Sequence, residues 1–228
     1  MEILYPDYLN NIILFNELEQ EQLDCIKSKS TLYTYPRGSI LFVEGQETNG
    51  TYIVLSGLIK VVKLHKEGRE KTLAILRRGD ILGEMTLFET TARSANAETM
   101  EESTVLYIPN ADFKQLLLDI PQLALQVIGI LADRLRQTDQ QIQELLFLNA
   151  RGRIICNLLH LAAGHGIIEN NLIKISLRLT HAELANLAGV SRETVTKVLD
   201  DLKKDDLIRI KDRQLWLLNT DELYQQGN

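Results

Sequence analysis

The sequence predicts an α+β protein with an N-terminal β-roll, a long connecting helix and a C-terminal winged helix-turn-helix. Short β-rich runs separated by glycines fill residues 30–108, a heptad seam follows residue 121, and two short helical patterns precede a hairpin pattern. A chain of 228 residues is long enough for two small domains with cores of their own. We therefore expect a β-roll domain at 1–120, the helix at 121–149 and the winged helix-turn-helix at 150–228.

The β-roll is predicted by runs of β-branched and aromatic residues with glycines as punctuation. The runs lie at 39–43, 51–55, 58–64, 72–76 and 104–108, and the glycines at 38, 45, 57, 68, 79 and 83. Regular strands with glycine turns are typical of a barrel or sandwich, here a double-stranded, jelly-roll-like one. Such a closed sheet offers a pocket for a small ligand.

One segment interrupts the strand pattern and carries the chemistry of an anion site. Gly83 and Glu84 lie at a turn, and Arg93 and Ser94 follow about ten residues later. An arginine fork with hydroxyl or N–H donors can hold a phosphate, and a carboxylate can accept from ribose hydroxyls. The segment predicts a loop that wraps a nucleotide. The alternative is that Arg93 forms an ordinary surface ion pair.

A long helix is expected from Pro121 to about residue 149. Its seam positions are spaced alternately by three and four residues, as in a parallel two-stranded coiled coil. They are Ile128, Leu131, Leu135, Thr138, Ile142 and Leu145. A polar group such as Thr138 costs stability in a seam unless it is hydrogen-bonded. The seam predicts a homodimer interface; the alternative is one amphipathic helix packed on its own domain.

Two short helices joined by a tight turn are expected at 180–203. Thr180 and Glu183 form a capping-box pattern. Gly189 suits a turn with positive φ, and Ser191 suits the N-cap of the second helix. The residues able to fill the space between the helices are Leu184, Ala185, Leu187, Val190, Val195 and Val198.

The outward face of the second helix carries Arg192, Glu193, Thr196 and Lys197. Arginine can pair with guanine O6 and N7, and glutamate can accept from cytosine N4. This face predicts a helix that enters the major groove of double-stranded DNA. The alternative is an ordinary helical hairpin with a solvated charged face.

Residues 207–218 alternate apolar and polar residues on both sides of 211–214, which predicts a β-hairpin. A helix-turn-helix followed by a hairpin is a winged helix. Trp216 lies in this hairpin, and we expect it in the core of the wing rather than stacked on a base.

The charge distribution favours the C-terminal part as the DNA face. The net charge of the chain is −6, but it is unevenly distributed. Residues 151–228 hold 11 Lys+Arg and 10 Asp+Glu, whereas residues 1–150 hold 14 Lys+Arg and 21 Asp+Glu. No apolar run approaches the ~20 residues of a membrane span, and the N-terminus lacks a secretory pattern. We expect a cytoplasmic, soluble protein without membrane contact.

The side chains that catalysis or metal binding would require do not cluster in the sequence. Cys25 and Cys156 are isolated and read as free thiols, with a redox-sensing pair as the alternative. The histidines show no metal-ligand spacing, with His160 and His165 five residues apart. We expect no enzyme activity, no metal site and no required cofactor.

From about residue 12 to 225 the chain resembles the Crp/Fnr family of bacterial transcription regulators. The pattern at 82–84, Leu87 and 93–95 is similar to the family's cyclic-nucleotide cassette, and 191–195 is similar to the start of its recognition helix. The resemblance implies that Gly83 and Glu84 face the ribose, that Arg93 and Ser94 face the cyclic phosphate, and that Thr138 contacts the adenine of cAMP.

The resemblance also implies a homodimer on a palindromic operator with TGTGA-like half-sites. Arg192, Glu193 and Lys197 would read bases. The positions that would touch phosphate are Ser191, Thr194, Thr180 and His181. The region from Ala162 to Asn171, expected as a loop, would meet RNA polymerase.

Three residues depart from the family pattern: Thr86 replaces a smaller residue, Lys197 replaces arginine, and Asp139 follows Thr138 where serine is common. The resemblance as a whole still implies a cyclic nucleotide such as cAMP as the effector, with another small effector or no ligand as alternatives. A further alternative is a regulator of this type that responds to redox state or a partner.

Overall fold

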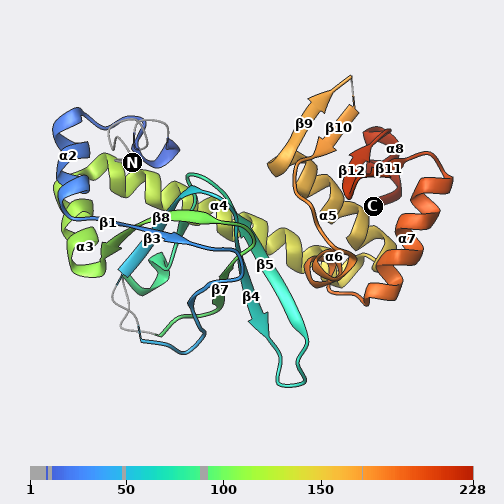
Figure 1. The fold of residues 1–228 in the computed structure, drawn as a ribbon, viewed down its shortest axis with the longest axis horizontal. Helices are drawn as coiled ribbons and strands as arrows, with labels where there is room; N and C mark the ends of the chain where they lie inside the picture. Colours follow the sequence, from blue (N-terminus) through green and yellow to red (C-terminus); the bar gives the residue numbers. More distant parts are fainter. Residues whose placement is uncertain (1–8, 10–11, 48–49, 88–91, 171, 228) are drawn as a thin grey trace. The chain divides into compact units, whose positions relative to one another are not determined.

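The computed structural model describes residues 9, 12–47, 50–87, 92–170 and 172–227 (Figure 1). The chain divides into two compact units, Met1–Arg134 and Leu135–Asn228, and the division falls inside one long helix. The first unit carries two antiparallel sheets, and the second carries a third sheet together with the four described helices that follow the long one. The α+β fold class expected from the sequence is confirmed.

The N-terminal unit is a β-roll of two four-stranded antiparallel sheets. The first sheet has the order β1 (Thr31–Tyr35), β8 (Ser103–Pro109), β3 (Gly50–Ser56), β6 (Ile81–Leu82). The second has the order β2 (Ile40–Phe42), β7 (Asn96–Thr99), β4 (Ile59–Leu64), β5 (Glu70–Leu76). All five predicted runs are strands. Apart from β4 and β5, which are consecutive, the neighbouring strands in each sheet are distant in sequence, as closure of a roll requires.

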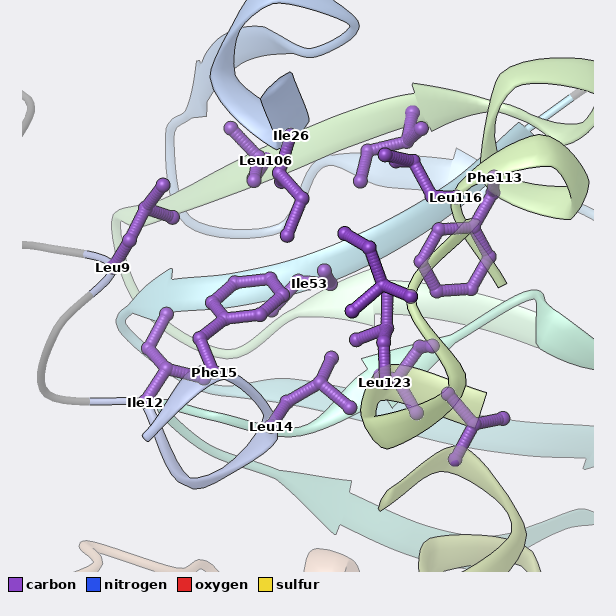
Figure 2. Close-up of a cluster of buried hydrophobic side chains, with 14 of the residues drawn as sticks. Leu9, Ile12, Leu14, Phe15, Ile26, Ile53, Leu106, Phe113, Leu116 and Leu123 are labelled. Carbon is purple, nitrogen blue, oxygen red and sulfur yellow. The ribbon is translucent and has the colours of Figure 1, made fainter. Parts of the chain in front are cut away.

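Short helices cover one face of the first sheet and enclose the main core (Figure 2). They are η1 (Ile13–Phe15), α2 (Gln20–Ser28), α3 (Asn110–Asp119) and the start of α4 (Pro121–Phe147). Ile53 and Leu106 on the strands meet Phe15, Phe113 and Leu123 from the helices, all essentially inaccessible to solvent. Each such side chain contributes about 1.5–3 kcal/mol through burial. This core fixes the first sheet against α4.

A second cluster occupies the inside of the roll, between the two sheets. Its buried members are Phe42, Val54, Ile59, Leu76, Leu82, Ala97 and Val105. Alternate residues of β3 point to opposite faces, so Val54 lies in this cluster while Ile53 lies in the main core. Tyr52 joins the inner cluster and stacks near Tyr107, with ring centroids 5.1 Å apart. The inside of the roll is therefore aromatic as well as aliphatic.

Helix α4 uses two different faces. Leu123 and Val127 are buried in the main core, and Leu131 packs against it. The seam residues Ile128 and Leu135 are 60% and 63% exposed. Ile142, Leu145 and Thr138 are exposed as well. The alternative, packing on the chain's own domain, thus applies to one face of α4 and includes Leu131. The other seam residues form an exposed, mostly apolar stripe in the single chain.

The C-terminal unit is a winged helix-turn-helix on a helical support. It contains α5 (Ala150–His165), α6 (His181–Ala188), α7 (Arg192–Lys204) and α8 (Thr220–Gly227). Its sheet has the order β11 (Ile208–Lys211), β12 (Gln214–Leu217), β10 (Leu172–Ile175), β9 (Gly166–Glu169). The region 162–171 was expected to be a loop, and this was wrong. It holds the end of α5 and strand β9, because β9 pairs with β10 and extends the wing sheet.

The space between α6 and α7 is filled largely as expected. Leu184, Ala185, Val195 and Val198 are buried, while Leu187 and Val190 are half-buried. Among the described residues, no single helix has both the length and the apolar composition of a membrane span. Helices α3 and α4 meet that test only when taken together across a bend of 113°.

Candidate functional site

Arg93 is the centre of the predicted effector loop, and it is buried rather than on the surface. Its side chain is 3% exposed. Nη2 donates to the backbone oxygen of Gly50 at 2.6 Å, and the guanidinium carbon lies 4.0 Å from the ring centroid of Phe42. Burial lowers the pKa of the guanidinium below its ordinary value. The alternative of an ordinary surface ion pair is therefore wrong.

The remaining donors of Arg93 are not matched by acceptors. Nε and Nη1 are buried, and neither has a hydrogen-bond partner among the described residues. A buried cationic donor without an acceptor is energetically unfavourable and needs an explanation. The arrangement can hold an anion, because an anion satisfies both the charge and the free N–H groups.

Gly83 lies directly against this guanidinium. Its φ is +82°, and a Cβ atom placed there would lie 1.8 Å from Nη1 of Arg93. Glycine is required both by the left-handed backbone and by the close approach. The structure therefore brings Gly83 and Arg93 together as the sequence analysis expected.

Glu84 follows Gly83 and begins the short helix η2 (Glu84–Leu87). Its side chain is 1% exposed, and Oε1 accepts a short hydrogen bond from Nη1 of Arg134 on α4. Nη2 of Arg134 donates to the backbone oxygen of Ile81 at 2.8 Å. Sequence reasoning missed Arg134, whose only signal is its place one turn before Thr138 on α4.

Ser94 and Thr86 complete the loop. The hydroxyl of Ser94 is at the surface, 3.7 Å from the sulfur of Met85. Thr86 is 7% exposed, and its hydroxyl donates to the backbone oxygen of Gly83 and accepts from Asn110. Thr86, which departs from the family pattern, is thus fixed against the backbone of η2. Residues 88–91 of the expected loop lie outside the described residues.

Both helices of the second site begin with the expected caps. Thr180 and Glu183 form a complete capping box, and the Ser191 side chain accepts from the N–H of Thr194. Gly189 ends α6 in the left-handed conformation, with φ of 63°. These local interactions fix the angle at which α7 leaves the turn.

The outward face of α7 carries exposed polar groups. Arg192, Glu193 and Lys197 are exposed. The pKa of Glu193 is lowered by its own backbone N–H at the helix start and by Ser191, so the carboxylate is ionised at neutral pH. A carboxylate and two cations on one exposed helix face suit the donors and acceptors of base edges and phosphates. Thr196 is the exception, since its hydroxyl contacts Nδ1 of His181 at 2.8 Å.

Comparison with known proteins assigns both regions. Residues 32–119 match the model of the cyclic nucleotide-binding domain, and residues 152–226 match that of the Crp-like helix-turn-helix domain. The chain is 30% identical over 214 residues to the CRP-like cAMP-activated global transcriptional regulator of Mycobacterium tuberculosis, covering 94% of this chain and 96% of the relative.

The chain belongs to the Crp/Fnr family. It is also 35% identical over 197 residues to the cyclic AMP receptor protein of Thermus thermophilus, covering 86% of this chain and 88% of that one. Among solved structures, a CooA mutant from Carboxydothermus hydrogenoformans matches with a TM-score of 0.80 and 28% identity, over 100% of this chain and 97% of that one. This Crp/Fnr protein is therefore a DNA-binding transcription regulator with a cyclic nucleotide-binding domain.

In this Crp/Fnr protein, Arg153 forms hydrogen bonds both to the last residue of α6 and to the segment that follows α4. Nε donates to the oxygen of Ala188 at 3.1 Å, and Nη1 donates to the oxygen of Leu148 at 3.1 Å. The sequence analysis missed this residue, because an arginine in an amphipathic helix carries no signal of a distant carbonyl partner. Arg153 joins the segment after α4 to the last turn of α6.

The wing follows its expected form. Asp212 and Arg213 have φ of 52° and 61°, as a two-residue hairpin turn with positive φ at both positions requires. Trp216 is half-buried on the wing sheet, with Nζ of Lys174 5.2 Å from its ring centroid. That placement supports a packing role in the wing.

Cys25 and Cys156 are free thiols, each half-buried. Burial, with a contribution from Glu144, raises the pKa of the Cys156 thiol. A raised thiol pKa lowers the thiolate fraction at neutral pH, and the thiolate is the reactive form. The burial of Cys156 and its proximity to Glu144 thus oppose formation of the thiolate.

Proposed function

We propose that this protein is a homodimeric regulator whose DNA affinity is controlled by a cyclic nucleotide, such as cAMP, bound inside the β-roll. The observation that carries the proposal is the buried Arg93 guanidinium with two N–H groups that no described residue satisfies. A cyclic phosphate supplies the missing negative charge and acceptors. The cAMP-related names of the Mycobacterium and Thermus relatives support the same ligand class.

The rest of the pocket suits a nucleotide. Glu84 can accept from a ribose hydroxyl through the carboxylate oxygen that Arg134 leaves available. Ser94 adds a hydroxyl donor at the surface of the same loop. Thr138 would add a contact to the base, as the family resemblance implies.

The coupling to α4 is the step that makes such a site regulatory. Arg134 on α4 forms an ion pair with Glu84 of the effector loop, in which the carboxylate is buried and the guanidinium is half-buried. A ligand that hydrogen-bonds to the other oxygen of Glu84 changes the strength of the Arg134 ion pair and favours one disposition of α4 over another. An effector shifts such an equilibrium only by its difference in affinity for the two states.

The exposed seam of α4 supports the homodimer. Ile128, Leu135 and Ile142 are seven residues apart and each leaves about half or more of its surface exposed in the single chain. Two copies paired along this seam would bury the apolar stripe. A dimer presents two α7 helices, which can read half-sites of a palindrome about 34 Å apart.

The reading residues would be Arg192, Glu193 and Lys197, with phosphate contacts from Thr180, His181, Ser191 and Thr194. Lysine at 197 makes no bidentate contact of the arginine kind, so the operator would match a TGTGA-like half-site only in part. In the cytoplasm, RNA polymerase would meet the β9 strand, where Ile167 and Ile168 are 49% and 77% exposed.

Calorimetry tests the effector. Titration of the purified protein with cAMP and with cGMP should show binding that Arg93→Ala abolishes. Arg69→Ala is the matched control, because Arg69 is an exposed arginine of the same unit that pairs with Glu67. Absence of heat at millimolar nucleotide, or equal binding by Arg93→Ala, would contradict the cyclic-nucleotide proposal.

A further inference from the structure

A chain of hydrogen bonds connects the two helices of the helix-turn-helix at the DNA-reading face. Nδ1 of His181, the first residue of α6, lies 2.8 Å from Oγ1 of Thr196 on α7. The same Oγ1 lies 3.0 Å from the backbone oxygen of Arg192, one turn earlier. Thr196 shares the exposed face of α7 with Arg192 and Lys197, so His181 stands at the edge of that face.

The positions of the protons in these two hydrogen bonds follow from the chemistry of the three groups. The oxygen of Arg192 is a carbonyl and can only accept, so the single proton of the Thr196 hydroxyl is donated to it. The hydroxyl must then accept from His181, and Nδ1 therefore carries a proton. In a neutral imidazole the other nitrogen, Nε2, is then a bare acceptor.

The second ring nitrogen is the one left for another partner. Among the described residues, none hydrogen-bonds to Nε2 of His181. The ring is half-buried and follows Thr180, the cap of α6, where the backbone N–H groups of a helix start favour anions. An Nε2 lone pair repels a phosphate oxygen, whereas an Nε2–H of the imidazolium donates to it.

We propose that His181 binds the DNA backbone only in its protonated form, so that each helix-turn-helix takes up one proton, on His181 of α6, when α7 docks. The proposal rests on DNA binding by α7, which family membership supports independently. Thr196 acts as a positioning residue in this scheme. It fixes the tautomer that prevents the neutral histidine from donating.

The charged groups near His181 belong to both helices. On α7, the Asp200 carboxylate interacts electrostatically with His181. On the same helix, the cations Arg192 and Lys197 flank Thr196. On α6, Glu183 is engaged by the N–H and hydroxyl of Thr180. The phosphates of bound DNA bring negative charge next to the ring, and this stabilises the protonated form of His181 in the complex.

The consequence is a DNA affinity that depends on pH near neutrality. Binding that takes up protons weakens as the pH rises. A histidine side chain changes charge between about pH 5 and 8. We expect the association constant to fall by up to about tenfold per pH unit for each half-site over this range.

The experiment measures proton uptake and affinity with the full-length protein, cyclic AMP at saturation and an operator duplex, at constant ionic strength. Calorimetry in buffers of different ionisation enthalpy should count about one proton per half-site for the wild type. His181→Ala should bind less tightly than the wild type at pH 6 and equally at pH 8. His165→Ala is the matched control from the same unit and should follow the wild type.

Thr196→Val tests whether the Thr196 hydroxyl fixes the tautomer of His181, because this variant keeps the histidine and removes the hydroxyl. The freed ring can place its proton on Nε2, so the variant should retain affinity at pH 8 and lose most of the proton uptake. Thr196→Ser should restore it. Uptake that is absent in the wild type, or unchanged in Thr196→Val, overturns the proposal. Loss of binding at every pH in the wild type would instead contradict DNA recognition by α7.

Discussion

Replacing Arg93 by methionine should separate the stability of the β-roll from its ligand binding. Methionine is unbranched and uncharged, so it can follow the path of the arginine stem without placing a polar group beside Phe42. In the ligand-free protein, Nε and Nη1 of the arginine are buried without partners among the described residues. Each unsatisfied buried donor costs about 1–3 kcal/mol, and methionine removes both.

The same substitution also removes favourable contacts. Stacking on Phe42, at 4.0 Å from the ring centroid, contributes about 2 kcal/mol when desolvated. The hydrogen bond from Nη2 to Gly50 contributes about 1.5–3 kcal/mol for a charged donor. Gains and losses are similar in size, so we expect the free energy of unfolding to change by no more than about 2 kcal/mol.

Thermal unfolding with and without cyclic AMP is the assay. At a ligand concentration of a hundred times Kd, the wild type should gain about 2.7 kcal/mol and Arg93→Met should gain nothing. Arg69→Met, on an exposed arginine, should behave as the wild type in both conditions. A loss of more than about 4 kcal/mol in ligand-free Arg93→Met, or an undiminished gain with nucleotide, would refute the view that the arginine is held ready for an anion.

Four further substitutions test other parts of the account. Arg192→Ala should lose about 1–3 kcal/mol on the preferred operator and relax specificity at one base pair in a binding assay; equal loss on random DNA would contradict base reading. Leu135→Glu should give a monomer at micromolar protein in sedimentation, whereas Leu118→Glu, on a still more exposed leucine of α3, should not; a wild-type monomer would contradict the dimer. Gly83→Ala should lower stability by about 1–3 kcal/mol and weaken nucleotide binding in calorimetry, because of its φ and its contact with Arg93; unchanged binding would exclude that contact. Burial raises the pKa of the Asp80 carboxyl, so charging it opposes folding; Asp80→Asn should be more stable than the wild type at pH 7 in denaturant unfolding, and the difference should vanish as the pH falls below about 4.

Features governed by neighbouring residues were predictable from the sequence. The capping box at Thr180, the N-cap at Ser191 and the left-handed Gly189 depend on residues within one turn, and the structure has all three. The hairpin turn at 212–213 and the strands of the roll follow local patterns in the same way. The apolar seam of α4 was predictable because its three- and four-residue spacing repeats along one helix.

Features governed by contacts distant in sequence were not predictable. Arg134 meets Glu84 fifty residues earlier, and only the closed roll beside α4 brings them together. Strand β9 was missed because its partner β10 and the wing strand β12 together complete its sheet. The bond between His181 and Thr196 joins two helices whose crossing depends on packed residues rather than on any motif.

The central claim is that a ligand beside Arg93 controls DNA recognition by α7. Selection of binding sites from a random DNA library, run with and without cyclic AMP on the wild type and on Arg93→Met, tests it most directly. We predict that the wild type enriches a two-fold symmetric site with half-sites about one helical turn apart only when nucleotide is present, and that Arg93→Met enriches none in either condition. Enrichment of the same site by both proteins without nucleotide would contradict the account.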